Sequence, residues 1–217
     1  IGPSSEDENV FAEMCRAGLN VARLNFSHGT HEDHKKKIDM IKKVRDELNA
    51  PIAIMLDTKG PEYRIKTFKN SPVTVCDGND FTFTSRDVIG DEHIVSVSYK
   101  DLPSDVEPGD KILVNNGLVS FEVTAVEGTE IKCKVLIGGE LSDCKSMSFP
   151  GKTLKQQYLS EQDKQDLLFG VRNGVDFIAA SFVSRRQDLV DLKEYLASIG
   201  GEKIDIIAKI ENRTGID

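Results

Sequence analysis

The stretch Asn20–Gly29, NVARLNFSHG, joins the end of an apolar strand to a group of polar side chains: Arg23, Asn25, Ser27 and His28. In α/β folds, the residues at the carboxyl ends of parallel strands carry the chemistry. The planar guanidinium of an arginine matches a phosphate or carboxylate, and oxygen side chains beside it suit a hard cation. The stretch therefore predicts a site for an anionic substrate and its counter-ion.

Three later apolar runs also end in polar residues: Pro51–Leu56, Val175–Ala180 and Asp205–Ile207. The polar residues that follow them are Asp57 and Thr58, then Ser181, then Lys209 and Glu211. The carboxyl ends of parallel strands meet on one face of a barrel. The polar ends of all four segments are therefore expected to converge there.

Helix patterns alternate with these strands. Three of them follow possible capping boxes, in which a hydroxyl and an acidic residue three positions later bond each other's backbone: Ser5 with Glu8, Thr30 with Asp33, and Ser160 with Asp163. Apolar residues recur at helical spacing, at Ile38, Ile41, Val44 and Leu48, and again at Leu189, Leu192 and Leu196. Strands and helices alternating over short connections favour a parallel sheet. We predict an α/β fold, a partial (β/α)8 TIM barrel.

The predicted barrel is incomplete. Four strands can be counted in full, with Ile1–Pro3 resembling the stub of another, whereas a barrel of this kind needs eight. An open half-barrel would expose strand edges and apolar surface. We therefore expect the chain to be a fragment of a longer protein.

The middle of the sequence has the period of β-strands instead of helices. Val119–Ala125 alternates apolar and polar residues, and Ile131–Ile137 repeats the pattern after a turn at Glu127–Gly128. Further short strands are expected at 80–84, 93–98 and 111–114. We predict a small antiparallel β-barrel domain, inserted after the third barrel strand and able to act as a lid. The predicted domains are 1–62 and 150–217 for the barrel, and 63–149 for the insert.

Composition excludes some classes of partner. The net charge of -8 argues against nucleic acid or an anionic membrane as the main partner. No apolar run approaches the length needed to span a membrane. The four cysteines lack metal-site spacing, which is typical of free thiols in the cytosol.

Several motifs in order along the whole chain resemble those of pyruvate kinase, in a bacterial style. They are NVARLNFSHGTHEDH from Asn20, LDTKGPEYR from Leu56, FPG at 149–151, LSEQDKQDLLFG at 159–170, ASF at 180–182 and AKIEN at 208–212. The resemblance covers roughly the N-terminal half of that family's chain. It implies transfer of a phosphoryl group from phosphoenolpyruvate to ADP, giving pyruvate and ATP in cytoplasmic glycolysis. It also implies a homotetrameric full-length protein.

The resemblance assigns roles to single residues. Arg23 matches the arginine that clamps the moving phosphoryl group, and Lys209 matches the lysine between that group and the enolate oxygen. Four residues match the ligands of a potassium ion, the third through its carboxylate and the fourth through its backbone carbonyl: Asn25, Ser27, Asp57 and Thr58. Neutral oxygens with one carboxylate suit a large monovalent ion better than zinc or iron.

The remaining matches concern the divalent metal and the nucleotide. Glu62 matches the glutamate that accompanies potassium dependence, and Glu211 matches one of two carboxylates that hold Mg²⁺ or Mn²⁺. His28 and Arg64 match residues near the nucleotide phosphates, and Lys145 matches a lid lysine on the same nucleotide, ADP or ATP.

The chain departs from the family pattern in the predicted lid. Asn115-Asn116 stands where paired aspartates are usual, which removes negative charge that would face a nucleotide-bound metal. The second magnesium carboxylate and the C-terminal regulatory domain of the family lie beyond residue 217. Because Mg²⁺ demands a near-octahedral set of ligands, the isolated 217-residue chain is expected to show no meaningful turnover.

Structural and functional alternatives stay open at this point. Arg23 could be a salt-bridged structural residue, Asp57 a helix cap, and Lys209 with Glu211 a solvated pair. His28, His31 and His34 have a zinc-like spacing, but Gly29 and Thr30 interrupt a common helix face. The full-length protein could also be a phosphoenolpyruvate-handling aldolase or lyase barrel, or a catalytically impaired relative that binds metabolites.

Overall fold

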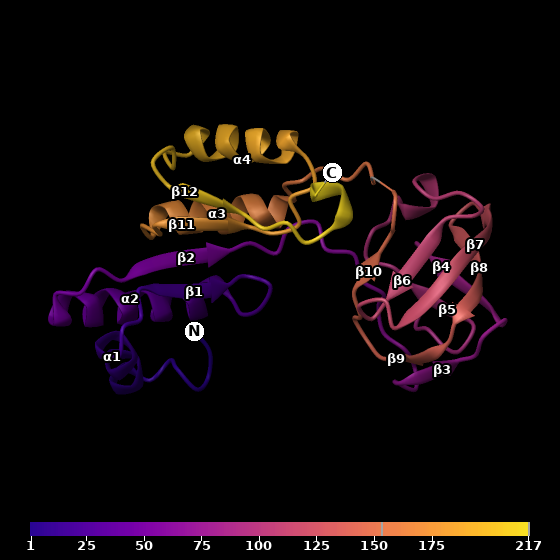
Figure 1. Cartoon of the computed structure of the whole chain (residues 1–217), viewed down its shortest axis with the longest axis horizontal. Coiled ribbons are helices and arrows are strands. Elements are labelled where there is room, and N and C mark those ends of the chain that lie inside the picture. Colours follow the sequence, from indigo (N-terminus) through magenta and orange to yellow (C-terminus); the bar gives the residue numbers. More distant parts are fainter. Residues whose placement is uncertain (153, 217) are drawn as a thin grey trace. The chain divides into compact units, whose positions relative to one another are not determined.

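The computed structural model describes residues 1–152 and 154–216 and divides the chain into two compact units. The first unit consists of residues 1–61 and 157–217, and the second of residues 62–156 (Figure 1). Each unit has its own hydrophobic core, one built around Leu24 and Ile54 and the other around Phe81 and Phe121.

A parallel sheet of four strands organises the first unit. Its order is β1 (Val21–Asn25), β2 (Ala53–Asp57), β11 (Phe177–Ala180) and β12 (Asp205–Ala208). The register aligns Asn25 with Asp57, and Ala179 with Asp57. The carboxyl ends of neighbouring strands therefore lie level, and the predicted α/β fold of a partial barrel is confirmed.

The described part of this unit contains the α-helices α1 (Glu8–Arg16), α2 (His31–Leu48), α3 (Glu161–Arg172) and α4 (Arg186–Ser198). The capping boxes predicted at Thr30 and Ser160 are confirmed. The box predicted at Ser5 is wrong. The carboxylate of Asp7 caps α1 instead, because it accepts from two amides of the first turn, while the Ser5 hydroxyl bonds the backbone of Gly2. A short 3-10 helix, η2 (Arg213–Gly215), follows the last strand.

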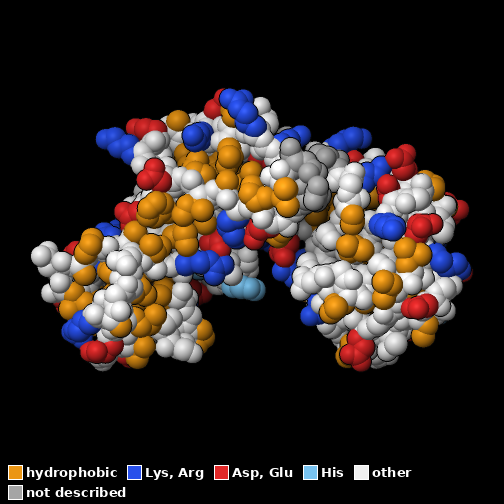
Figure 2. Space-filling model, in the orientation of Figure 1, with side chains coloured by type: hydrophobic (Ala, Val, Ile, Leu, Met, Phe, Trp, Pro, Cys, Tyr) orange, Lys and Arg blue, Asp and Glu red, His pale blue; other side chains and the backbone are white. Residues whose placement is uncertain are grey.

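The core of the first unit lies between the sheet and its helices. Ile38, Ile41 and Val44 of α2 are buried, as the helical stripe predicts, and so are Leu192 and Leu196 of α4. Along β1, buried Ala22 and Leu24 alternate with more exposed neighbours. The two end strands also carry apolar residues that are partly exposed to solvent: Val21 in β1 is 43 % exposed, and Ile207 in β12 is 43 % exposed. Figure 2 shows apolar side chains gathered over this unit.

The second unit is built from β-strands, as the alternating pattern predicts. A six-stranded sheet has the order β10 (Met147–Ser148), β6 (Lys111–Val114), β7 (Val119–Glu127), β8 (Glu130–Ile137), β4 (Asp80–Thr84) and β5 (Ile94–Ser96). A second sheet pairs β3 (Val73–Val75) with β9 (Gly139–Leu141), and η1 (Leu102–Ser104) is a single 3-10 turn.

One pair of strands in this unit departs from the antiparallel prediction, since β4 and β5 are parallel. The chain between them returns along the sheet edge, where the buried hydroxyl of Ser96 bonds the backbone of Arg86 and Val88. Alternation of apolar and polar residues identifies a strand but not the direction of its partner. The pattern therefore contained no signal for this pair.

Candidate functional site

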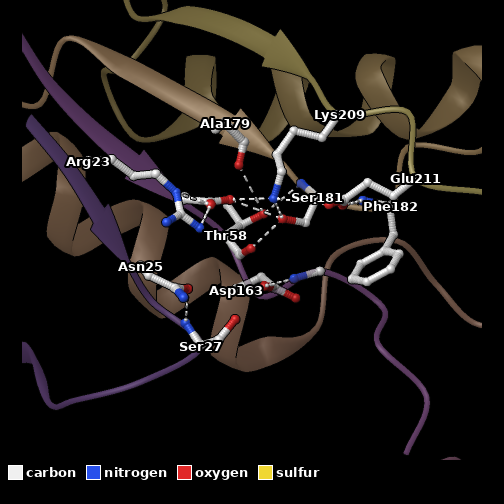
Figure 3. A network of polar contacts seen from close by, with 12 residues as sticks. Arg23, Asn25, Ser27, Thr58, Asp163, Ala179, Ser181, Phe182, Lys209 and Glu211 are labelled. Atoms are coloured by element: carbon white, nitrogen blue, oxygen red, sulfur yellow. Dashed lines mark hydrogen bonds and ion pairs between the residues drawn. The ribbon is translucent and has the colours of Figure 1, made fainter. Parts of the chain in front are cut away.

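The carboxyl ends of the four parallel strands bring one polar cluster together (Figure 3). Arg23 comes from β1, Asp57 from the last position of β2, Ser181 from the residue after β11, and Lys209 from the residue after β12. Residues up to 186 positions apart in the sequence therefore meet in the first unit.

Asp57 is the centre of this cluster. Its side chain is only 2 % exposed, and it forms ion pairs with both Arg23 and Lys209. Arg23 Nε donates to Asp57 Oδ2 over 2.6 Å, and Lys209 Nζ donates to Oδ1 over 2.9 Å. A buried carboxylate is costly unless it is paired and hydrogen-bonded. The two cations thus hold Asp57 in place and are themselves oriented by it.

Ser181 is a member of the cluster to which the sequence analysis gave no role. Its buried hydroxyl accepts from Lys209 Nζ over 2.8 Å and donates to the backbone carbonyl of Thr58 over 2.6 Å. The Ser181 carbonyl accepts from the buried hydroxyl of Tyr158 over 2.8 Å. Burial raises the pKa of Tyr158, so this hydroxyl stays protonated. The sequence signal that could have identified Ser181 was its position as a hydroxyl residue directly after an apolar strand.

Glu211 lies beside Lys209. Its Oε1 is 3.4 Å from Lys209 Nζ, and its Oε2 accepts from the backbone amide of Phe182 over 2.9 Å. Phe182 has a φ of 56°, a conformation that a bulky residue rarely adopts and that costs of order 1–3 kcal/mol. The backbone is therefore strained at the point where it orients this carboxylate.

Asn25 and Ser27 lie on the β1 side of the cluster, below Arg23 in Figure 3. Asn25 Oδ1 accepts from the backbone amide of Ser27 over 3.0 Å. The amide of Phe26, between them, donates to the Asp57 carbonyl over 3.0 Å. The loop is thereby tied to β2.

The chemistry of these groups fits a monovalent cation better than a transition metal. Asn25, Ser27 and Thr58 offer neutral oxygens, and Asp57 adds one carboxylate, a set that suits a hard, weakly charged ion. Within the described residues there is no cluster of three or more histidine, cysteine or acidic side chains that could hold a metal ion. Glu211 provides a single carboxylate for a divalent ion, whose other ligands would have to come from substrate, water or further residues.

The remaining predicted site residues have partners of their own. His28 is exposed, and its carbonyl oxygen lies 2.9 Å from His34 Nε2. Glu62, Arg64 and Lys145 belong to the second unit, where Arg64 forms an ion pair with Glu62 and the amide of Ile65 donates to the Lys145 carbonyl. Their roles stay predictions.

The structure decides some of the alternative interpretations. Arg23 and Lys209 are both paired with Asp57, and 51 % of the Arg23 side chain is exposed, so Arg23 is not closed off as a buried structural residue would be. The interpretation of Asp57 as a helix cap is wrong. The described partners of its carboxylate are the side chains of Arg23, Lys209 and Ser181.

Asn115 and Asn116 form the turn between β6 and β7 with φ values of 55° and 56°. Asparagine tolerates this left-handed conformation better than most residues. The pair therefore has a conformational reason to be present in this turn, whatever its effect on a metal.

No helix in the described part of the chain combines the length and the apolar character needed to cross a membrane.

Comparison with known proteins shows which family the chain resembles. The chain is 45 % identical to a pyruvate kinase of Clostridium perfringens over 218 aligned residues, and 41 % identical to that of Clostridium acetobutylicum, covering 100 % of this chain and 46 % of each relative. It is 43 % identical to the pyruvate kinase of Staphylococcus haemolyticus, of which it covers 37 %. The chain thus spans less than half the length of these relatives. The family model of the pyruvate kinase barrel domain matches residues 1–217, and the chain belongs to the pyruvate kinase family.

Proposed function

We propose that the full-length protein carrying this chain transfers the phosphoryl group of phosphoenolpyruvate to ADP, giving pyruvate and ATP. The observation that supports this most directly is the cluster at the strand ends, in which Arg23 and Lys209 flank one buried carboxylate, Asp57. Phosphoryl transfer depends mainly on positioning and on electrostatic stabilisation. A half-exposed arginine and a lysine held by Asp57 would supply the two positive charges that such a reaction needs.

Arg23 is proposed to bind the phosphoryl group, because it reaches the cluster from β1 and is half exposed. Lys209 is proposed to neutralise charge between that group and the enolate oxygen of pyruvate. Its Nζ is held by Asp57, Ser181 and Glu211, so it does not need to reorganise as charge develops.

Two metal ions complete the proposal. Glu211 would hold Mg²⁺ or Mn²⁺, which when bound neutralises charge on the transferring group. Asn25, Ser27, Asp57 and Thr58 would hold K⁺, and Glu62 is proposed to accompany potassium dependence. The neutral oxygens around the single carboxylate of Asp57 support this assignment.

The nucleotide is proposed to contact His28, Arg64 and Lys145, with residues 63–149 acting as a lid domain. We further propose that the full-length protein is a homotetramer of cytoplasmic glycolysis. Residues 1–217 alone are proposed to lack meaningful turnover, since Glu211 by itself would leave most ligand positions of a divalent ion unfilled.

The test is steady-state formation of pyruvate from phosphoenolpyruvate and ADP by the full-length protein. A Lys209→Met variant is expected to lower kcat by about 10²–10³-fold, the usual effect of removing one group that stabilises developing charge. Lys203→Met is the matched control, because Lys203 is exposed and precedes the same strand. Absence of ADP-dependent pyruvate formation by the parent protein would refute the proposal. Equal kcat values for the parent and the Lys209→Met variant would refute the role of the lysine.

A further inference from the structure

The loop 26–30, between β1 and α2, contains one proposed potassium ligand, Ser27, and one proposed nucleotide contact, His28. Asn25 directly precedes it. Four of its backbone amides are hydrogen-bonded: those of Phe26 and His28 to the carbonyls of Asp57 and Asn25, and those of Ser27 and Thr30 to the side chains of Asn25 and Asp33. The carbonyl of His28 is held by a further side chain.

That side chain is His34, which is 4 % exposed. Its Nε2 lies 2.9 Å from the carbonyl oxygen of His28. Its ring stacks on Phe26, with 3.9 Å between centroids and 9° between planes. His34 thus contacts the loop twice, once through a backbone carbonyl and once through an aromatic side chain.

The hydrogen bond fixes the tautomer of His34. A carbonyl only accepts, so Nε2 carries the proton, and Nδ1 is then the unprotonated nitrogen. Nδ1 is buried without a hydrogen-bond partner in the described part of the chain. A second proton would have no acceptor there, and burial lowers the pKa of His34 despite the nearby carboxylate of Asp166. The Nε2 proton is therefore directed at the loop, and burial favours the neutral form of the ring.

We propose that His34 is a positioning residue for the cation and nucleotide site, which it serves by fixing the backbone of residues 26–30 through the His28 carbonyl. This rests on the proposed function for the identity of the ligands. In this role, His34 contacts neither the ion nor the nucleotide. It acts by presenting the Ser27 hydroxyl and the His28 side chain in one conformation.

His31 provides a matched control on the same helix. Its Nε2 lies 2.6 Å from Asp166 Oδ1, and its ring stacks on Phe169 of α3, with 4.5 Å between centroids. It therefore ties α2 to α3, and the structure gives it no hydrogen bond to the loop backbone among the described residues. Loss of His31 perturbs helix packing without releasing the His28 carbonyl.

The experiment compares amide side chains of two lengths in the full-length protein. The amide nitrogen of His34→Gln can take the place of Nε2, whereas that of His34→Asn reaches only the place of Nδ1. We expect His34→Asn to raise the half-saturating K⁺ concentration by about tenfold, because the His28 carbonyl would then lose the donor that holds it. The KM for ADP should rise by a few-fold and kcat at saturating K⁺ should change by less than about twofold. His34→Gln and His31→Gln should stay within about threefold of the parent in both constants.

A second measurement does not depend on activity. Hydrogen exchange of a peptide covering residues 24–33 should be faster in His34→Asn than in the parent, and close to the parent in His34→Gln and His31→Gln. Equal half-saturating K⁺ concentrations in the glutamine and asparagine variants would overturn the proposal. So would unchanged exchange in His34→Asn. If the parent protein forms no pyruvate, the proposed function fails, and the exchange comparison alone still decides whether His34 holds the loop.

Discussion

Ser181 shows how one hydroxyl can organise a charged cluster. It accepts from the Lys209 ammonium group and donates to the Thr58 carbonyl, so it links the end of β12 to the end of β2. Without the Ser181 hydroxyl, the buried carbonyl of Thr58 would lack this donor. A buried acceptor left unsatisfied costs more than the hydrogen bond itself contributes.

The Ser181→Ala substitution is therefore expected to lower the free energy of unfolding by about 1–3 kcal/mol. Denaturant unfolding monitored by circular dichroism measures the change. Ser198→Ala is the control, because the Ser198 hydroxyl also bonds a backbone carbonyl but is exposed, and its loss should cost less than about 0.5 kcal/mol. Equal losses in the two variants would contradict the importance of burial at Ser181.

At the scale of elements, the loop after β2 passes very close to the end of β11. Gly60 has a φ of 65°, and a Cβ added there would lie 2.7 Å from the backbone oxygen of Ser181. The approach is possible because glycine has no side chain and tolerates a positive φ. It keeps Thr58 and Ser181 within hydrogen-bond distance of each other.

Gly174 is a control that separates the cost of a positive φ at Gly60 from the cost of its close approach to Ser181. Its φ is 62° and it lies in the same unit, but a Cβ there would meet only the Lys42 side chain, at an ordinary 3.5 Å. We expect Gly174→Ala to cost about 1–2 kcal/mol for the left-handed backbone. Gly60→Ala should cost about 1–3 kcal/mol more, because backbone must move to relieve the clash. Denaturant midpoints of both variants measure this difference. Similar midpoints would show that the loop after β2 moves to accommodate the Cβ without loss of stability.

The elements themselves were largely predictable from the sequence. Strand ends and helix starts depend on local patterns, so Asp57, Lys209 and the caps at Thr30 and Ser160 could be recognised from neighbouring residues alone. The role of Ser181 depends on Thr58, which lies 123 positions away, and no local pattern reports what faces a hydroxyl across a sheet. The parallel pairing of β4 with β5 and the choice of Asp7 over Ser5 as a cap were missed for a related reason. For the cap, both residues offered a local solution, and the pattern did not distinguish between them. For the strand pair, the alternation does not report the direction of the partner strand.

At the scale of the whole molecule, we expect the two units to differ in their sensitivity to pH. Residues 62–156 contain one histidine, His93, which is exposed, while His28, His31 and His34 belong to the other unit. Among these, His34 is buried, and burial lowers its pKa from the ordinary value of 6.5. Lys37, Asp166 and His31 are the charged or titratable groups that also act on its ring.

The direction of the pH effect follows from linkage. When the pKa of a histidine is lower in the folded state than in the unfolded state, the unfolded chain binds more protons between the two values. The free energy of unfolding of the first unit should therefore fall as the pH decreases through about 6.5, and this loss should end below the folded-state pKa. The second unit lacks such a group and should change less over the same range.

Segment-resolved hydrogen exchange measures this prediction, because the two units can open separately and the sequence has no tryptophan to report on either one. Peptides from α2 should lose protection between about pH 7.5 and about pH 6, after correction for intrinsic exchange rates, while peptides from β7 and β8 should not. The His34→Gln variant lacks the titrating ring, so α2 should lose less protection in it than in the parent. The same loss of protection in both proteins would contradict the role given to the buried ring of His34.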